Sequence, residues 1–319
     1  MRRLLLALAL VAAGLAHAAD DAADYPSRAV TLVVPYPPGG PNDVIARTLG
    51  PELSASLGKP VVIENRPGAG GNTATGVVAR ATADGHTVLV PGIPYAVNPA
   101  LFDKVPYTFA DFRAVSVVAR GALVLVAHPS LGVKSVGDLL AMAKAQPGKV
   151  AYASGGIGTS PHLAGELFKR MAGVDLLHVP YKGTADFMAD LLAGRAPVAF
   201  VSPLAIRSHV ESGKMVGLGV TGSGPLRGME SLPPIAKSVP GYEAYGWYAL
   251  MVPTATRPAI VDRLSKATAT ALQSQAVQEK LYALGLDLVR TSPGEAEAYI
   301  RAEAERWAKL AREANIRAE

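Results

Sequence analysis

The stretch VAYASGGIGTSPHLAGELF, residues 150–168, predicts a strand, a glycine-rich turn and a helix in direct succession. Its apolar run ends at Ser154, and three glycines stand among the next four residues. Thr159 or Ser160 can cap the helix, and Pro161 suits the first helical position. Glycines ahead of a helix let the unpaired N–H groups of its first turn approach an anion with no side chain in between. The stretch therefore predicts a strand–turn–helix unit whose helix end is suited to an anion.

A second stretch, VVPYPPGGPNDVIARTLG at 33–50, has the same order of strand, glycine turn and helix. Gly39 and Gly40 permit positive φ and close approach, and Asn42 or Asp43 is a good N-cap. A hydrogen bond to a charged group contributes about 1.5–3 kcal/mol. Two such helix ends facing one cleft would therefore hold a small polycarboxylate without an arginine. Either loop alone is more simply a capped turn, and it is the pair that favours ligand binding.

Short β-rich runs alternate with helical patterns along the rest of the chain. The expected strands are 29–36, 60–65, 86–92, 122–129, 149–154, 196–202 and 215–221. The expected helices include 136–148 and 184–195, and long amphipathic helices over 258–285 and 293–316. Strands that alternate with helices predict an α/β protein with parallel sheets, and a chain of this length usually forms two domains.

Two further features bear on the loops. The glycine-rich stretch 64–81 either lines the same cleft or makes a tight turn in domain packing, and its residues favour neither interpretation. Pro51 is expected to interrupt the helix that follows the first loop, because proline has no backbone N–H.

The first residues, MRRLLLALALVAAGLAHA, have the order of a secretory signal peptide. Two arginines precede an apolar run, and the last three residues form an A-x-A cleavage site. The run from Leu4 to Leu15 is too short to cross a bilayer comfortably. We therefore expect residues 1–18 to be removed and the mature protein to be located in the periplasm.

The composition excludes several classes of protein and partner. The chain has no cysteine, which rules out a disulfide framework. Its net charge of +5 comes from scattered residues, and no basic run interleaved with aromatics predicts nucleic-acid binding. The glycine loop is neither a dinucleotide fingerprint nor a lysine-bearing phosphate loop, so no cofactor is expected. We expect a monomer.

Catalytic and metal-binding patterns are missing from the sequence. No G-x-S-x-G motif occurs, and the six histidines are dispersed without an H-x-x-x-H pair. His162 alone lies on a candidate loop, where it either contacts ligand or water or is a solvated residue of the first helical turn. His178 is more simply a hydrogen-bonded structural histidine. Trp247 and Tyr248 would suit a cleft wall, but packing in the core is the favoured interpretation.

Five segments, in this order, resemble the Bug family of periplasmic solute-binding proteins, the receptors of tripartite tricarboxylate transporters. They are PYPPGGPNDVIAR, VVIENRPGAGGNTATGVVARATADGHTVLV, NPALFDKVPYTFADFRAVSVVAR, YASGGIGTSPHLAGELFK and LLHVPYKGTADFMADLLAGR. The resemblance covers nearly the whole mature chain, and so many motifs in one order are specific to the family.

The resemblance implies a periplasmic binding protein fold of type II, with two α/β domains and a ligand cleft between them. One domain would combine 25–120 with 244–319, and the other would hold 121–243. The receptor would capture a small carboxylate, such as a di- or tricarboxylate or an aromatic acid, and deliver it to membrane transporter subunits. Two alternatives stay open: a protein that presents ligand to a membrane sensor kinase, and a secreted α/β enzyme that uses a nucleotide.

The resemblance also implies a set of ligand-binding residues. These are Tyr36, Gly39, Gly40, Asn42 and Asp43 on one side, and Ser154, Gly158, Thr159, Ser160 and His162 on the other. The family usually has an aspartate where this chain has Ser202. That departure favours a plain organic acid over an amino acid, and Ser202 completes the predicted site.

Overall fold

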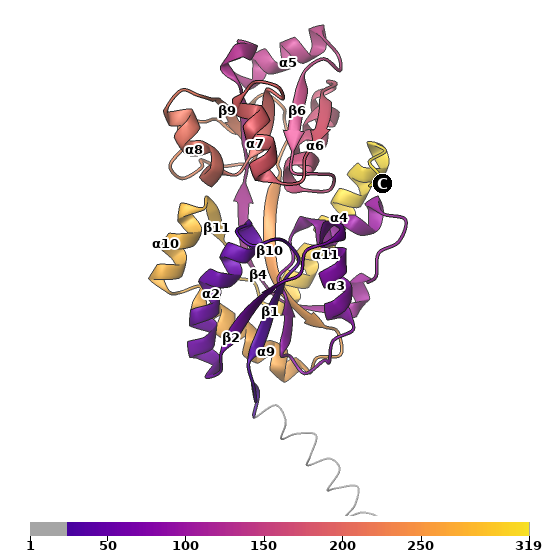
Figure 1. Ribbon diagram of the computed structural model, residues 1–319, viewed down its shortest axis with the longest axis vertical. Helices are drawn as coiled ribbons and strands as arrows, with labels where there is room; N and C mark the ends of the chain where they lie inside the picture. Colours follow the sequence, from indigo (N-terminus) through magenta and orange to yellow (C-terminus); the bar gives the residue numbers. More distant parts are fainter. Residues whose placement is uncertain (1–23, 319) are drawn as a thin grey trace, which may run out of the picture.

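The computed structural model describes residues 24–318, which form two lobes, one above the other in Figure 1. The expected signal peptide, residues 1–18, lies outside the described residues. Each lobe contains one β-sheet with helices on both faces. None of the helices in the described part of the chain has the length and apolar character needed to span a membrane.

The first lobe is built on a six-stranded sheet in the order β11-β4-β10-β3-β1-β2. Its strands are β1 (Val30–Val34), β2 (Val61–Asn65), β3 (Thr87–Leu89), β4 (Phe112–Ala122), β10 (Tyr245–Pro253) and β11 (Leu286–Leu288). Its helices are α2 (Pro41–Leu57), α3 (Asn72–Ala79), α4 (Ile93–Leu101), α9 (Pro258–Ala271), α10 (Gln275–Ala283) and α11 (Pro293–Glu313).

Alternation along β1 explains how helices cover both faces of this sheet. Leu32 and Val34 are buried in the core that contains residues of α2, α9 and α10. Val33 points to the opposite face and joins the core formed with α3, α4 and α11. Successive side chains of a strand point to opposite faces, so a run of apolar residues requires cover on both sides.

The second lobe is built on a five-stranded sheet in the order β7-β6-β8-β5-β9. Its strands are β5 (Val124–Ala127), β6 (Ala151–Ser154), β7 (Leu177–Pro180), β8 (Val198–Val201) and β9 (Val216–Val220). Its helices are α5 (Val136–Ala145), α6 (Ser160–Ala172), α7 (Thr184–Leu192) and α8 (Pro203–Glu211). The cores place α5 and α6 on one face of the sheet and α7 and α8 on the other.

Both sheets are mixed, which corrects the expectation of parallel sheets. β10 runs antiparallel to β3 and β4, and β5 runs antiparallel to β8 and β9. Alternation of strands and helices predicts parallel neighbours only where a helix crosses between them. The segments that pass between the lobes carry no such helix, since Leu123 alone separates β4 from β5.

Two expectations about helices were also wrong. The segment 258–285 forms two helices, α9 and α10, because residues 272–274 are not helical. The Gln278 side-chain amide donates a hydrogen bond to the Leu272 carbonyl at 3.1 Å, which satisfies this carbonyl at the end of α9. Conversely, α2 continues through Pro51 to Leu57. Its apolar residues on both sides of the proline are buried, and that packing holds the helix together despite one missing N–H.

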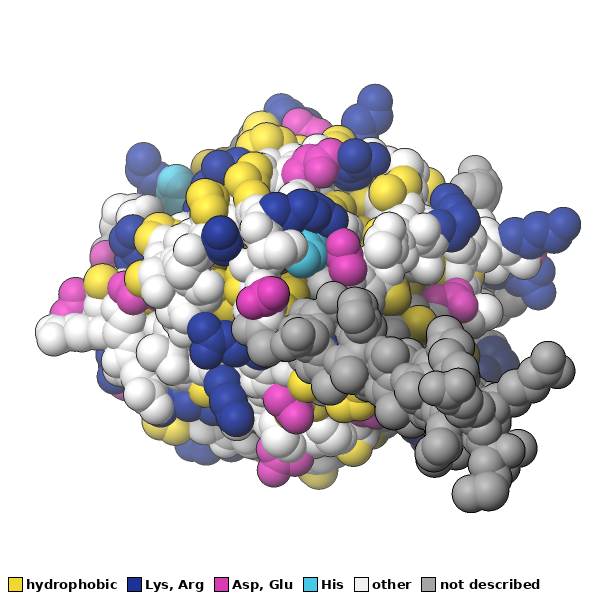
Figure 2. Space-filling model, turned by 90° about the horizontal axis from the view of Figure 1, so that it is seen from below, with side chains coloured by type: hydrophobic (Ala, Val, Ile, Leu, Met, Phe, Trp, Pro, Cys, Tyr) yellow, Lys and Arg dark blue, Asp and Glu magenta, His cyan; other side chains and the backbone are white. Residues whose placement is uncertain are grey.

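The charges seen on the face in Figure 2 are dispersed. Lys and Arg side chains are interspersed with Asp and Glu over the described residues of this face, without a large region of one sign. This arrangement agrees with the scattered basic residues of the sequence.

Candidate functional site

The glycine turn of the second lobe, residues 155–159 between β6 and α6, packs against the first lobe. Gly158 has φ +79°, and a Cβ at this position would lie 2.8 Å from the Leu101 Cδ1. The same position lies 3.5 Å from the Asn98 Oδ1, and both residues belong to α4. Only glycine therefore allows the turn to adopt this backbone and to approach α4 so closely.

Ser160, the first residue of α6, reaches the first lobe at β10. Its Oγ lies 3.3 Å from the position of a Cβ on Gly246, and the Tyr248 hydroxyl lies 3.7 Å from the same point. Burial raises the pKa of Tyr248 to about 12. Burial, followed by the influence of Tyr248, also raises the pKa of Tyr36. The structure thus brings Ser160, from the second predicted loop, to Gly246 and Tyr248 of β10.

The first predicted loop is held together by Asp43. This buried carboxylate accepts hydrogen bonds from the Gly39 N–H at 2.9 Å, from the Arg47 Nε at 3.0 Å and from the Asn65 Nδ2 at 3.0 Å. Burial acts to raise the pKa of Asp43, but these hydrogen bonds outweigh it and the pKa is lowered. Asp43 is therefore an ionised group that fixes the loop around Gly39, and its oxygens are already used.

Asn42 has a similar internal role, and neither it nor Asp43 is the N-cap of α2. The Asn42 side chain is buried and its Nδ2 donates to the Val90 carbonyl at 2.9 Å, which ties α2 to the end of β3. The N-cap is Gly40, which supplies no side-chain hydrogen bond to the helix. At the start of α6, the N-cap Thr159 donates its hydroxyl to the Gly156 carbonyl at 2.7 Å instead of capping. Both helices therefore begin without a side-chain cap.

Two stacked histidines lie beneath the glycine turn. The Ser154 Oγ, at the end of β6, is 2.7 Å from the His178 Nε2, and it accepts the Gly156 N–H at 3.1 Å. His162 is only 3% exposed, and its Nδ1 accepts the Gly158 N–H at 3.1 Å. Of the two alternatives for His162, the solvated residue is therefore wrong, whereas His178 is the hydrogen-bonded histidine that was expected.

Ser202 also lies near the junction of the lobes. It is the N-cap of α8 and supplies no side-chain hydrogen bond to that helix. The next residue, Pro203, packs on the first lobe, because a Cβ on Gly285 would lie 2.6 Å from the Pro203 Cγ. Ser202 thus immediately precedes the contact between α8 and the turn before β11.

Asn98, which no pattern in the sequence singles out, lies where the two lobes meet. Its Nδ2 donates to the Gly70 carbonyl at 3.1 Å and to the Asn72 Oδ1 at 2.8 Å, while its Oδ1 faces the turn at Gly158. The glycine-rich stretch 64–81 therefore supports the α4 surface that the second lobe contacts. The motif NPALFDK contained Asn98, but only tertiary structure shows that it meets Gly158.

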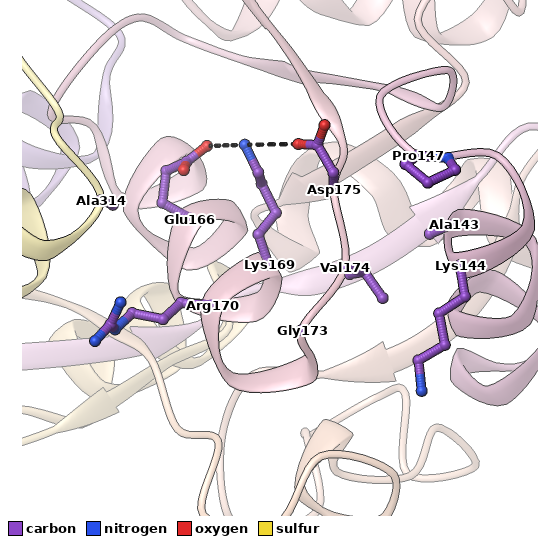
Figure 3. A pocket seen from close by; sticks show the side chains of 10 residues that line it. All are labelled: Ala143, Lys144, Pro147, Glu166, Lys169, Arg170, Gly173, Val174, Asp175 and Ala314. Atoms are coloured by element: carbon purple, nitrogen blue, oxygen red, sulfur yellow. Dashed lines mark hydrogen bonds and ion pairs between the residues drawn. The ribbon is translucent and has the colours of Figure 1, made fainter.

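Two surface hollows lie apart from this junction. One, of 620 Å³, is formed by α5, α6 and the end of the chain, with Lys169 between Glu166 and Asp175 at 3.2 and 3.7 Å (Figure 3). The other, of 890 Å³, lies between α4 and α11. Neither contains a predicted ligand-binding residue. Within residues 24–318, no group of His, Cys, Asp and Glu side chains is arranged to hold a metal ion.

Comparison with known proteins places the chain in a family. Residues 45–316 match the family described as "Tripartite tricarboxylate transporter family receptor". Protein BugT of Bordetella pertussis is 38% identical over 318 residues, which cover 98% of this chain and 98% of that protein. The chain belongs to the Bug family of tripartite tricarboxylate transporter receptors. This Bug protein is therefore a solute-binding receptor and not an enzyme.

Solved structures give the same answer for the fold. R. palustris Rpa4515, solved with adipate, matches with a TM-score of 0.84 and 36% identity, over 92% of this chain and 99% of that one. The periplasmic binding protein BugD matches with a TM-score of 0.81 and 30% identity, over 92% and 100%. MatC from Rhodopseudomonas palustris, solved with malate, matches with a TM-score of 0.80 and 28% identity, over 90% and 99%. This Bug protein has the two-domain periplasmic binding protein fold.

Proposed function

We propose that this Bug protein binds a small carboxylate between its lobes and delivers it to the membrane subunits of a tripartite tricarboxylate transporter. One observation carries the proposal. The uncapped N-terminus of α6 meets α4 and β10 of the first lobe, where the Tyr248 hydroxyl lies close to Ser160. Tyr248 also influences the pKa of Tyr36 at the start of the first glycine loop, and the two glycine loops are proposed to face one another at this junction.

The chemistry of this junction suits a carboxylate. Unpaired N–H groups at a helix N-terminus and the helix dipole both favour an anion. The Tyr248 hydroxyl, whose pKa burial raises to about 12, is neutral at physiological pH and is proposed to donate a hydrogen bond to the carboxylate. Adipate and malate, with which two relatives were solved, are both small dicarboxylates.

The predicted residues divide into two roles within this proposal. Tyr36, Gly40, Thr159, Ser160 and Ser202 are proposed to contact the ligand. Three of them, Gly40, Thr159 and Ser202, are N-caps that give no side-chain hydrogen bond to their helices. The others are proposed to hold the loops in place: Gly39, Asn42, Asp43, Ser154, Gly158 and His162.

The organisation of the mature receptor completes the proposal. The domain boundaries are proposed to lie near 120 and 244, where the chain passes between the two sheets, so that 25–120 and 244–319 form one domain. Residues 1–18 are proposed to be a signal peptide that directs the protein to the periplasm, where it acts as a monomer. The charged, apolar and A-x-A order of these residues supports this location.

A thermal-shift panel of dicarboxylates, tricarboxylates, aromatic acids, acidic amino acids and NAD tests the ligand class. A ligand at a hundred times its dissociation constant stabilises a protein by about 2.7 kcal/mol. We expect at least one plain carboxylate to stabilise the receptor and to be recovered unchanged. Stabilisation by NAD alone, or by no carboxylate, would overturn the proposal. Genetic deletion of the receptor should abolish uptake of that carboxylate; intact uptake with a lost transcriptional response would favour the sensor alternative.

A further inference from the structure

We propose that His162 and His178 are positioning residues that clamp the two ends of the Ser154–Thr159 turn, and that His162 acts through an unprotonated Nδ1. The consequence for ligand affinity rests on the proposed function, whereas the clamp itself does not. Neither histidine needs to touch the ligand for this role.

The first contact of the clamp is at the far end of the turn. The Gly158 N–H donates to the His162 Nδ1 at 3.1 Å, and His162 is almost completely buried. A glycine with positive φ has no side chain to restrict it. The hydrogen bond to His162 therefore fixes the backbone conformation of Gly158, which has no side chain to restrict it.

The second contact of the clamp is at the near end. The His178 Nε2 is 2.7 Å from the Ser154 Oγ, and Ser154 is fully buried. The same Oγ accepts the Gly156 N–H at 3.1 Å. His178 thereby holds the serine rotamer that orients the first glycines of the turn.

Stacking joins the two contacts into one unit. The rings of His162 and His178 lie 4.2 Å apart and are inclined by 29°, and Tyr152 stacks on His178 at 4.9 Å. The Tyr152 hydroxyl is anchored by the Glu166 carboxylate at 2.6 Å. A displacement of either histidine would therefore be transmitted to the other end of the turn.

The surroundings keep the two rings neutral. Burial, followed by the neighbouring His178 and Lys169, lowers the pKa of His162 to about 3. Burial, followed by Lys169, lowers the pKa of His178 to about 4. The acidic group of this cluster, Glu166, is engaged with Tyr152 and Lys169. An unprotonated Nδ1 on His162 is thus available as an acceptor at physiological pH.

The wild-type protein provides the first test, without any ligand. Nitrogen-15 NMR of the histidine rings should show the Nε2-protonated tautomer of His162 from pH 5 to 8, with the Gly158 amide protected from hydrogen exchange. A protonated Nδ1, or an unprotected Gly158 amide in the folded protein, would overturn the clamp.

A matched pair of variants provides the second test. His162→Asn keeps an oxygen acceptor near the position of Nδ1, whereas His162→Leu has a similar volume and no acceptor; both lose the ring stack. We expect His162→Leu to lose Gly158 protection and to bind adipate about tenfold more weakly than His162→Asn, the size of one hydrogen bond. Equal protection and equal affinity in the two folded variants would overturn the proposal. If the wild type does not bind adipate, amide protection alone decides, and it is the ligand assignment that is in question.

Discussion

A side chain has no room at Gly158, and this makes the glycine a direct probe of the junction. Its φ of +79° strains a β-branched residue, and a Cβ would lie 2.8 Å from Leu101 of the other lobe. We expect Gly158→Val to reduce carboxylate affinity by far more than tenfold. Thr159→Ala removes a single hydroxyl, which donates to the Gly156 carbonyl and is proposed to contact the ligand, so it should cost less, about 0.5–3 kcal/mol. Calorimetric titration with parallel unfolding curves measures both, and unchanged affinity in folded Gly158→Val protein would mean that the ligand binds elsewhere.

The histidine pair also predicts how stability depends on pH. Burial lowers the pKa values of His162 and His178 to about 3 and 4, below the value of about 6.5 in an unfolded chain. The unfolded chain therefore binds more protons than the folded one below about pH 6.5, so the free energy of unfolding falls as pH falls. Urea unfolding from pH 4.5 to 7.5 should show this, with a shallower fall in His162→Leu. Parallel curves for variant and wild type would contradict the prediction.

The residue scale also marks the limit of what the sequence could predict. The glycines of both loops and the serine and threonine near α6 were found from composition and spacing, because turns and caps are local features. The role of His162 was not found, because its partner Gly158 and its neighbour His178 depend on how β7 packs beside β6. Position in a sequence gives no sign of whether a histidine is buried.

At the scale of elements, seven strands of the described chain lie within the ranges expected from the sequence: β1, β2, β3, β5, β6, β8 and β9. The other four, β4, β7, β10 and β11, were not predicted. β4 and β10 form one long antiparallel pair that extends to the second lobe, with register shifts along it. The two strands are separated along the chain by the whole of the second lobe, so no local pattern indicates the pairing. At β10 the sequence indicated no strand, only that Trp247 and Tyr248 would pack in the core. Trp247 is indeed fully buried, and its ring contacts Tyr299 edge-on.

Thr221 forms hydrogen bonds to both segments that pass between the lobes, at Leu123 and at Ala244. Its buried Oγ1 accepts the Leu123 N–H at 2.7 Å, and its carbonyl accepts the Ala244 N–H at 2.9 Å. Thr221→Val keeps the shape but leaves the Leu123 N–H unpaired, which should cost about 1–3 kcal/mol of unfolding free energy. Urea unfolding measures this loss. Thr270→Val, at an exposed site on α9, is the control and should change stability by less than about 0.5 kcal/mol. Equal losses of stability in the two variants would show that the Thr221 hydroxyl does not stabilise the protein more than an exposed threonine does.

At the scale of the whole molecule, glycines occupy three points where the lobes touch. Gly158 meets Leu101, Gly246 meets Ser160, and Gly285 meets Pro203. In each pair the Cβ of any other residue would lie 3.3 Å or less from an atom of the opposite lobe. The close contact between the lobes therefore depends on glycine at these three positions. No apolar pattern in the sequence predicts this requirement.

Gly246 offers the cleanest test of this dependence, because its φ does not favour glycine and alanine adds only a Cβ. That Cβ would lie 3.3 Å from the Ser160 Oγ, closer than side chains normally pack, so Ser160 or the backbone around it must shift slightly. We expect Gly246→Ala to weaken carboxylate binding several-fold in calorimetric titration, with little loss of stability. Gly224→Ala, with nothing within 4 Å of the added Cβ, is the matched control. A Gly246→Ala protein that binds carboxylate as tightly as the Gly224→Ala control would show that closure of the lobes does not depend on the contact between Gly246 and Ser160.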